Sequence, residues 1–165
     1  MTRPRILVAG VGNIFRGDDA FGVEVVRRLA GRPLPAGVRA VDFGTRGHDL
    51  AYAILDGYDV VILVDTTCRA DSPGTLCTLE PEAPARVTTA PLGTGSTHGV
   101  NLPAVFQLVR LLGGTLPCVR LVGCEPLTLG TEEDGAMGLS EPVRAAVDGA
   151  VELVEALIAE ALSGT

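Results

Sequence analysis

Three side chains that can bind metals or exchange protons stand where an expected strand gives way to a helix or loop. Asp19 lies in "GVGNIFRGDDAFG" (10–22), Asp65 ends "DVVILVD" (59–65), and His98 lies in "STHGVN" (96–101). Ligands of open parallel sheets collect in the crevice beyond the carboxyl ends of the strands. Taken alone, each residue has an ordinary explanation as a helix cap or local hydrogen-bond partner. Together they form an oxygen, oxygen, nitrogen set that suits Zn, Ni or Mn with open coordination positions.

The first of these segments superficially resembles a nucleotide-binding turn. A dinucleotide fingerprint requires glycine at the position that Phe15 occupies. Asp18 and Asp19 also place carboxylates where a helix N-terminus would hold a phosphate, so a bound pyrophosphate would meet like charge. We therefore expect no dinucleotide here, and we interpret Asp18 as a cap or first-turn residue of the helix that follows.

Short β-branched segments alternate with segments of helical periodicity, which is typical of a parallel sheet covered by helices. The sequence predicts one α/β domain spanning residues 1–165, with three layers, a mostly parallel five-stranded sheet and helices on both faces. Ser140, Pro142 and Gly164 mark the ends of the last helix. The expected strands are Arg5–Gly10, Val38–Gly44, Asp59–Asp65, Gly74–Glu80 and Cys118–Cys124; the expected helices are Ala20–Ala30, His48–Asp56, Val100–Leu112 and Glu141–Leu162; Glu80–Thr97 is an expected surface loop.

The composition of the chain argues against several classes of binding partner and cellular location. The 165 residues carry a net charge of -7 and no basic run, which disfavours nucleic acid and anionic membranes. The apolar stretch near the N-terminus is too short for a signal peptide and no segment is long enough to span a membrane, so we expect a cytoplasmic protein. The four cysteines form no C-x-x-C pair, and we expect reduced, mostly buried thiols. Cys68, three residues beyond Asp65, is interpreted as structural rather than as a nucleophile.

Five blocks, in this order, make the sequence similar to a known family: "GVGNIFRGDDAFG", "DFGTRG", "VVILVDT", "STHGVNLPAVF" and "LVGCEP" with "GLSEPV". They resemble the [NiFe]-hydrogenase maturation endopeptidases over nearly the whole chain. The resemblance implies a phosphorylase/hydrolase-like fold and a cytoplasmic, aspartyl-type processing peptidase. Such an enzyme removes a C-terminal extension from the hydrogenase large-subunit precursor after nickel insertion. It also implies that this precursor is the partner, and a monomer is the default state.

The resemblance assigns roles to individual positions. Asp19, Asp65 and His98 match the family's metal-binding and catalytic positions, where the first ligand is Glu in some members. The nickel would come with the substrate, and another divalent ion such as Zn or Cd could occupy the same site. The "DFGTRG" block corresponds to a family block associated with choosing the cleavage site, which assigns substrate contact to Asp42, Gly44 and Thr45. Two positions depart from the pattern: Phe43 replaces a glycine, and His48 stands where an apolar residue is common.

The expected mechanism makes substrate nickel a checkpoint, because the enzyme's three ligands would complete its coordination. Asp19 or Asp65 could position or deprotonate the attacking water. Activity should weaken on acidification as His98 becomes charged. The sequence has no H-E-x-x-H, no G-x-S-x-G and no plausible Cys–His pair, which argues against the commoner proteases. The alternatives are a non-catalytic α/β module that binds a metal or nucleotide, and a related peptidase that acts on another precursor.

Overall fold

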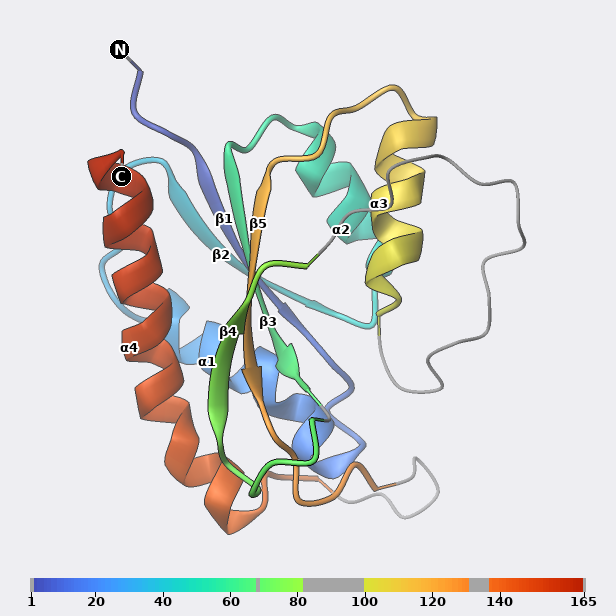
Figure 1. Cartoon of the computed structure of the whole chain (residues 1–165), viewed down its shortest axis with the longest axis vertical. Helices are drawn as coiled ribbons and strands as arrows, with labels where there is room; N and C mark the ends of the chain where they lie inside the picture. The colour runs from blue at the N-terminus through green and yellow to red at the C-terminus, as the bar shows by residue number, and fades with distance from the viewer. Residues whose placement is uncertain (1, 68, 82–99, 131–136, 165) are drawn as a thin grey trace.

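The computed structural model describes residues 2–67, 69–81, 100–130 and 137–164, which build one five-stranded sheet with helices on both faces (Figure 1). The strand order is β2-β1-β3-β5-β4; β2, β1, β3 and β5 run parallel, and β4 pairs antiparallel with β5. This arrangement confirms the predicted fold class. The strands are β1 (Ile6–Val11), β2 (Val38–Gly44), β3 (Val60–Thr66), β4 (Leu76–Leu79) and β5 (Cys118–Cys124).

The helices form the two outer layers. They are α1 (Phe21–Ala30), α2 (Gly47–Leu55), α3 (Leu102–Leu111) and α4 (Glu141–Ser163). Helices α1 and α4 pack on one face of the sheet, and α2 and α3 pack on the other (Figure 1). Alternation along the buried strands separates the two cores, because successive side chains of a strand point to opposite faces. Ile6 and Val8 of β1 face α1 and α4, while Leu7 and Ala9 face α2 and α3.

The expected elements all form: Val38–Gly44 and Cys118–Cys124 have the expected boundaries, and the others are shifted by one or two residues. One element was not predicted: a single 3-10 turn, η1 (Gly17–Ala20), comes between β1 and α1 and contains both aspartates. Pro142 stands in the first turn of α4, and Gly164 ends that helix in the left-handed conformation with φ of 75°, as expected. Most of the predicted Glu80–Thr97 loop lies outside the described residues.

Glycines let α1 begin in direct contact with the sheet. A Cβ at Gly22 would lie 2.0 Å from the Val64 carbonyl oxygen and 2.5 Å from that of Val11. A Cβ at Gly12, where φ is +139°, would lie 1.8 Å from the Asp19 carbonyl oxygen. The close helix–strand approach that a dinucleotide fingerprint assigns to its third glycine is thus made at Gly22, and Phe15 is exposed instead.

The cysteines differ from expectation. Of the three whose side chains the structure describes, Cys124 is buried, Cys77 is partly buried and Cys118 is exposed, and none forms a disulfide. Among these three cysteines the prediction of mostly buried thiols is therefore wrong: Cys118 is the exposed first residue of β5, and that strand becomes buried only toward its other end. Within the described ranges, no helix is long and apolar enough to cross a membrane.

Candidate active site

Asp19 and Asp65 lie at the same edge of the sheet. Asp19 belongs to η1, directly after β1, and Asp65 is the penultimate residue of β3, which pairs with β1. After β1 the chain continues to β2 on one side of β1, and after β3 it continues to β4 and then β5 on the other side. The carboxyl ends of β1 and β3 therefore form the topological switch point, which is where open α/β sheets bind their ligands.

The two carboxylates interact electrostatically. The pKa of Asp65 is raised from its ordinary 3.8 to about 8, chiefly by burial and also by the negative charge of Asp19, against the opposing effect of hydrogen bonds from Thr66. The Thr66 N–H donates to Asp65 Oδ1 at 2.7 Å. The site as it stands thus disfavours two negative charges, and a cation between them would relieve both the burial cost and the repulsion.

Asp19 is almost completely buried and is held by the turn that precedes it. The Asn13 N–H donates to Asp19 Oδ2 at 3.0 Å. The Asn13 side chain in turn accepts a hydrogen bond from the Phe15 N–H at 2.9 Å. The backbone between β1 and η1 therefore wraps around the Asp19 carboxylate.

His98 lies outside the described residues, as does the side chain of Cys68. Asn101, three positions after His98, caps α3: its side chain accepts from the Ala104 N–H at 3.1 Å. In the described part of the chain no three His, Cys, Asp or Glu side chains gather at one point. The predicted set of Asp19, Asp65 and His98 is represented there by its two carboxylates, and the role of all three stays a prediction.

Asp18 does stand in the first turn of a helix, η1, but its interpretation as a helix cap is wrong. Asp18 lies inside η1, makes no cap to that turn or to α1, and is completely buried. Its carboxylate instead accepts hydrogen bonds from the N–H groups of Leu127, Thr128 and Ser140 and from the Ser140 hydroxyl. Ser140 does occupy the N-cap position of α4, but its hydroxyl is directed to Asp18 rather than to the helix. Local sequence rules find caps within one segment, and here the partners are more than 100 residues apart.

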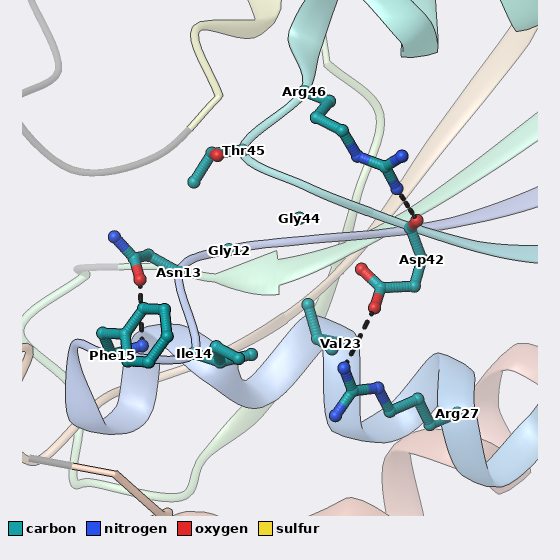
Figure 2. Close-up of a pocket in the computed structure, with 10 residues that line it drawn as sticks. All are labelled: Gly12, Asn13, Ile14, Phe15, Val23, Arg27, Asp42, Gly44, Thr45 and Arg46. Carbon is teal, nitrogen blue, oxygen red and sulfur yellow. Dashed lines mark hydrogen bonds and ion pairs between the residues drawn. The ribbon is translucent and has the colours of Figure 1, made fainter.

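A pocket of about 320 Å³ opens beside the switch point (Figure 2). Asp42, Gly44 and Thr45, the residues assigned to substrate contact, all line it, together with the turn after β1 and with Val23 and Arg27 of α1. Arg27 forms an ion pair with Asp42 at 3.4 Å, and Arg46 donates to the Asp42 carbonyl oxygen at 2.5 Å. Figure 2 shows these two arginines on opposite sides of Asp42. The pocket thus combines an apolar wall with a charged end.

The two departures from the family pattern do not enter this pocket. Phe43 is buried in the core between the sheet and α2 and α3, at a point where the register of β1 and β2 slips by one residue. His48 is exposed in the first turn of α2, as a helix-start residue. Neither side chain lines the pocket.

Glu125 is a buried carboxylate that sequence reasoning did not single out. It directly follows β5, and its Oε2 accepts from the Arg69 N–H at 2.8 Å. Its backbone bonds to Gly74 and Thr75, so it ties the segment after β3 to β5. The signal that pointed to Asp65, an acidic residue at the end of an apolar strand, is also present at Glu125. In β5 itself, burial raises the pKa of the Cys124 thiol to about 11, which keeps it unreactive.

Comparison with known proteins agrees with the fold and identifies the family. The sequence model of the hydrogenase maturation protease family matches residues 23–157. The hydrogenase 2 maturation protease of Escherichia coli is 34% identical over 94% of this chain and 92% of its own length. HupD, a hydrogenase expression/formation protein of Rhodobacter capsulatus, is 33% identical over 89% of this chain and 68% of its own.

A solved structure has the same fold as this chain. The hydrogenase maturating endopeptidase HybD from E. coli superimposes with a TM-score of 0.75 at 33% identity, over 94% of this chain and 93% of that one. This chain belongs to the hydrogenase maturation protease family. It is an endopeptidase that processes hydrogenase, and the alternative of a non-catalytic binding module is set aside.

Proposed function

We propose that this protease removes the C-terminal extension of a [NiFe]-hydrogenase large-subunit precursor after nickel has been inserted. In this proposal the nickel belongs to the substrate, and Asp19, Asp65 and His98 complete its coordination. A precursor without nickel would lack the ion that brings the cleavage site to these ligands. Metal insertion would then be checked before the chain is cut.

The observation that carries the proposal is the pair of carboxylates at the switch point. The pKa of Asp65 is raised to about 8 by burial and by Asp19, so without a cation the pair shares its negative charge at a cost. A divalent ion reverses that balance, because carboxylates must be deprotonated to bind it. Carboxylate and imidazole ligands suit nickel, and also zinc or cadmium, so such ions could fill the site in place of the substrate's nickel.

The reaction needs a water to be positioned and partly deprotonated beside the scissile carbonyl group. Hydrolysis adds this water across the peptide bond, leaving a new carboxylate on the mature subunit and an amine on the released peptide. A metal ion bound here polarises the carbonyl oxygen or the water. Asp19 or Asp65 would hold the water and accept its proton.

The neighbouring pocket supports binding of the substrate chain on one side of the cut. Asp42, Gly44 and Thr45 form one wall, and Ile14 and Val23 provide an apolar one. A side chain of the precursor would enter between them, next to the Arg27–Asp42 ion pair. We propose that the enzyme acts as a monomer.

The test is the intact mass of a nickel-loaded large-subunit precursor after incubation with the wild-type protein and with Asp19→Ala, Asp65→Ala and His98→Ala. We expect the wild type to remove one C-terminal peptide and the three variants, checked for folding, to leave the mass unchanged. Asp148→Ala is the matched control, because Asp148 is an exposed acid on α4. The same precursor without nickel should stay intact.

Two results would contradict the proposal. Cleavage of the nickel-free precursor at the same rate would remove the checkpoint. An unchanged mass with wild-type protein and a precursor shown to contain nickel would point to a different substrate of the same enzyme.

A further inference from the structure

Asp18 makes an unusually complete set of contacts for a carboxylate with no exposed surface. Its Oδ2 accepts from the N–H groups of Leu127 at 2.9 Å and Thr128 at 3.1 Å and from the Ser140 hydroxyl at 2.8 Å. Its Oδ1 accepts from the Ser140 N–H at 2.7 Å. Burying a charge is costly unless hydrogen bonds compensate it, and here four donors converge on one side chain. We call Asp18, Leu127, Thr128 and Ser140 the Asp18 clamp.

The clamp joins three segments that are distant in sequence. It fastens η1 to the segment that follows β5 and to the first residue before α4. The backbone adds to the same junction: the Asp18 N–H donates to the Thr128 carbonyl oxygen at 3.1 Å, and Arg16 donates to that of Gly130 at 3.2 Å. The turn is therefore held from outside by both main chain and side chain.

Asp18 and Asp19 are consecutive residues of one short turn, and their side chains serve different partners. The Asp18 carboxylate binds Leu127, Thr128 and Ser140. The Asp19 carboxylate accepts from the Asn13 N–H and raises the pKa of Asp65. A single 3-10 turn has few internal hydrogen bonds of its own to fix its orientation. The direction of the Asp19 carboxylate thus depends on what holds its neighbour.

We propose that Asp18 is a positioning residue for Asp19: the Asp18 clamp fixes η1 so that the Asp19 carboxylate stays directed at the switch point. The inference rests on the proposed function for the role of Asp19 in the reaction. It goes beyond that function by making Leu127, Thr128 and Ser140 part of the support of the active site. Residues that orient a ligand commonly change metal affinity or activity about 10–100-fold when they are removed.

The decisive variant is Asp18→Asn, which keeps the size of the side chain but presents an amide N–H₂ to a donor of the clamp. We expect the Asn13 amide, which donates to Asp19, to exchange its hydrogen at least about tenfold faster, while Val8 and Ile62 in the buried strands exchange as in the wild type. With nickel-loaded precursor, kcat should fall about tenfold or more and KM should stay within about twofold.

Two further variants separate positioning from folding. Ser140→Ala removes the hydroxyl donor of the clamp and leaves the Asp18 carboxylate in place. The Asn13 amide should therefore exchange faster than in the wild type, but by less than in Asp18→Asn. Ser140→Thr should return the exchange rate of Asn13 to that of the wild type. Asp148→Asn is the same chemical change at an exposed position and should alter nothing at Asn13.

The inference is overturned if the Asn13 amide exchanges at the wild-type rate in folded Asp18→Asn. It is equally overturned if exchange rises by the same factor throughout β1 and β3, because the carboxylate then stabilises the fold as a whole. Exchange is measured on the free protein without metal or precursor, so this outcome is independent of whether the proposed substrate is cut.

Discussion

The acidic residues near the switch point differ in how their charge is compensated. Asp18 has four hydrogen-bond donors at its carboxylate, and the Asp19 carboxylate accepts from the Asn13 N–H. Asp65 accepts from Thr66 but remains poorly compensated, and its pKa rises to about 8. A carboxylate whose charge is compensated by the protein's own hydrogen-bond donors has a structural role. The weak compensation of the Asp65 charge indicates instead a carboxylate that binds a ligand.

This difference predicts the effect of pH on the metal-free protein. The folded state holds a proton on Asp65 between pH 3.8 and about 8 while the unfolded chain does not, so this residue lowers stability progressively as the pH rises through that window. Asp65→Asn removes the penalty and keeps an acceptor for the Thr66 N–H. Thermal unfolding should therefore show a Tm at least about 3 °C above that of the wild type at pH 8, and no difference near pH 3.

The same variant should lose the ability to process a precursor, since an amide is a poor replacement for an anionic ligand. A gain in Tm that is equal at pH 3 and pH 8 would mean that ionisation of Asp65 is not the cause.

At the scale of elements, the start of α1 determines where η1 and its aspartates lie. The helix begins against the carbonyl oxygens of Val11 and Val64, and only a glycine at position 22 leaves room for them. Val64 directly precedes Asp65, so the contact also sets the spacing between the two candidate ligands. A change in the contact between α1 and the strands would therefore also change the geometry of the active site.

A substitution at this contact should damage both stability and activity. In Gly22→Ala the new Cβ would lie 2.0 Å from the Val64 carbonyl oxygen, so α1 must move away from the sheet. We expect a loss of about 3 kcal/mol in the free energy of unfolding, or roughly 6–12 °C in Tm. Processing measured below the lowered Tm should also be slower, because η1 moves with the helix.

Gly31→Ala is the matched control for this substitution. Gly31 ends the same helix with φ of -77°, and a Cβ there would meet the carbonyl oxygens of Arg28 and Arg27 at ordinary distances of 3.5 and 3.9 Å. Its Tm should equal or slightly exceed that of the wild type. Equal Tm values for Gly22→Ala and Gly31→Ala would show that the contact is not tight.

For the whole molecule, the strand order brings the candidate ligands together from separate parts of the chain. The switch between β1 and β3 joins a turn near residue 19 to a strand end at residue 65, and the Asp18 clamp connects that turn to the start of α4. An ion bound at this junction would bind the folded state alone. Ion binding is therefore coupled to the global unfolding equilibrium.

This coupling predicts that a divalent ion raises the Tm of the free protein. With Zn²⁺ at about 100 times its Kd the gain is about 2.7 kcal/mol, measured by thermal unfolding at pH 8. The gain should decrease toward pH 5, because the ion must then displace the proton of Asp65 and, as proposed, that of His98. Asp148→Asn should keep the full shift, and Asp65→Asn should lose most of it. An equal shift in both variants would place the ion elsewhere.

Local patterns were enough to predict the five strands, the four helices and the fold class. Apolar periodicity and capping residues act within about twenty residues, so the last helix is already marked by Pro142 and Gly164. The ends of the strands also pointed to Asp19 and Asp65, because parallel strands place their carboxyl ends at one edge. The family blocks added Asp42, Gly44 and Thr45, which line one pocket.

Only the tertiary structure showed which residues distant in sequence are in contact, and how those contacts change the role of a side chain. It turned Asp18 from an expected cap into a residue held by Leu127, Thr128 and Ser140, and it placed Phe43 in the core. It also revealed the burial and the coupling with Asp19 that raise the pKa of Asp65. Hydrogen bonding, burial and repulsion between charges depend on distance in space, and no local rule of sequence reports which segments a fold will bring within a few ångströms.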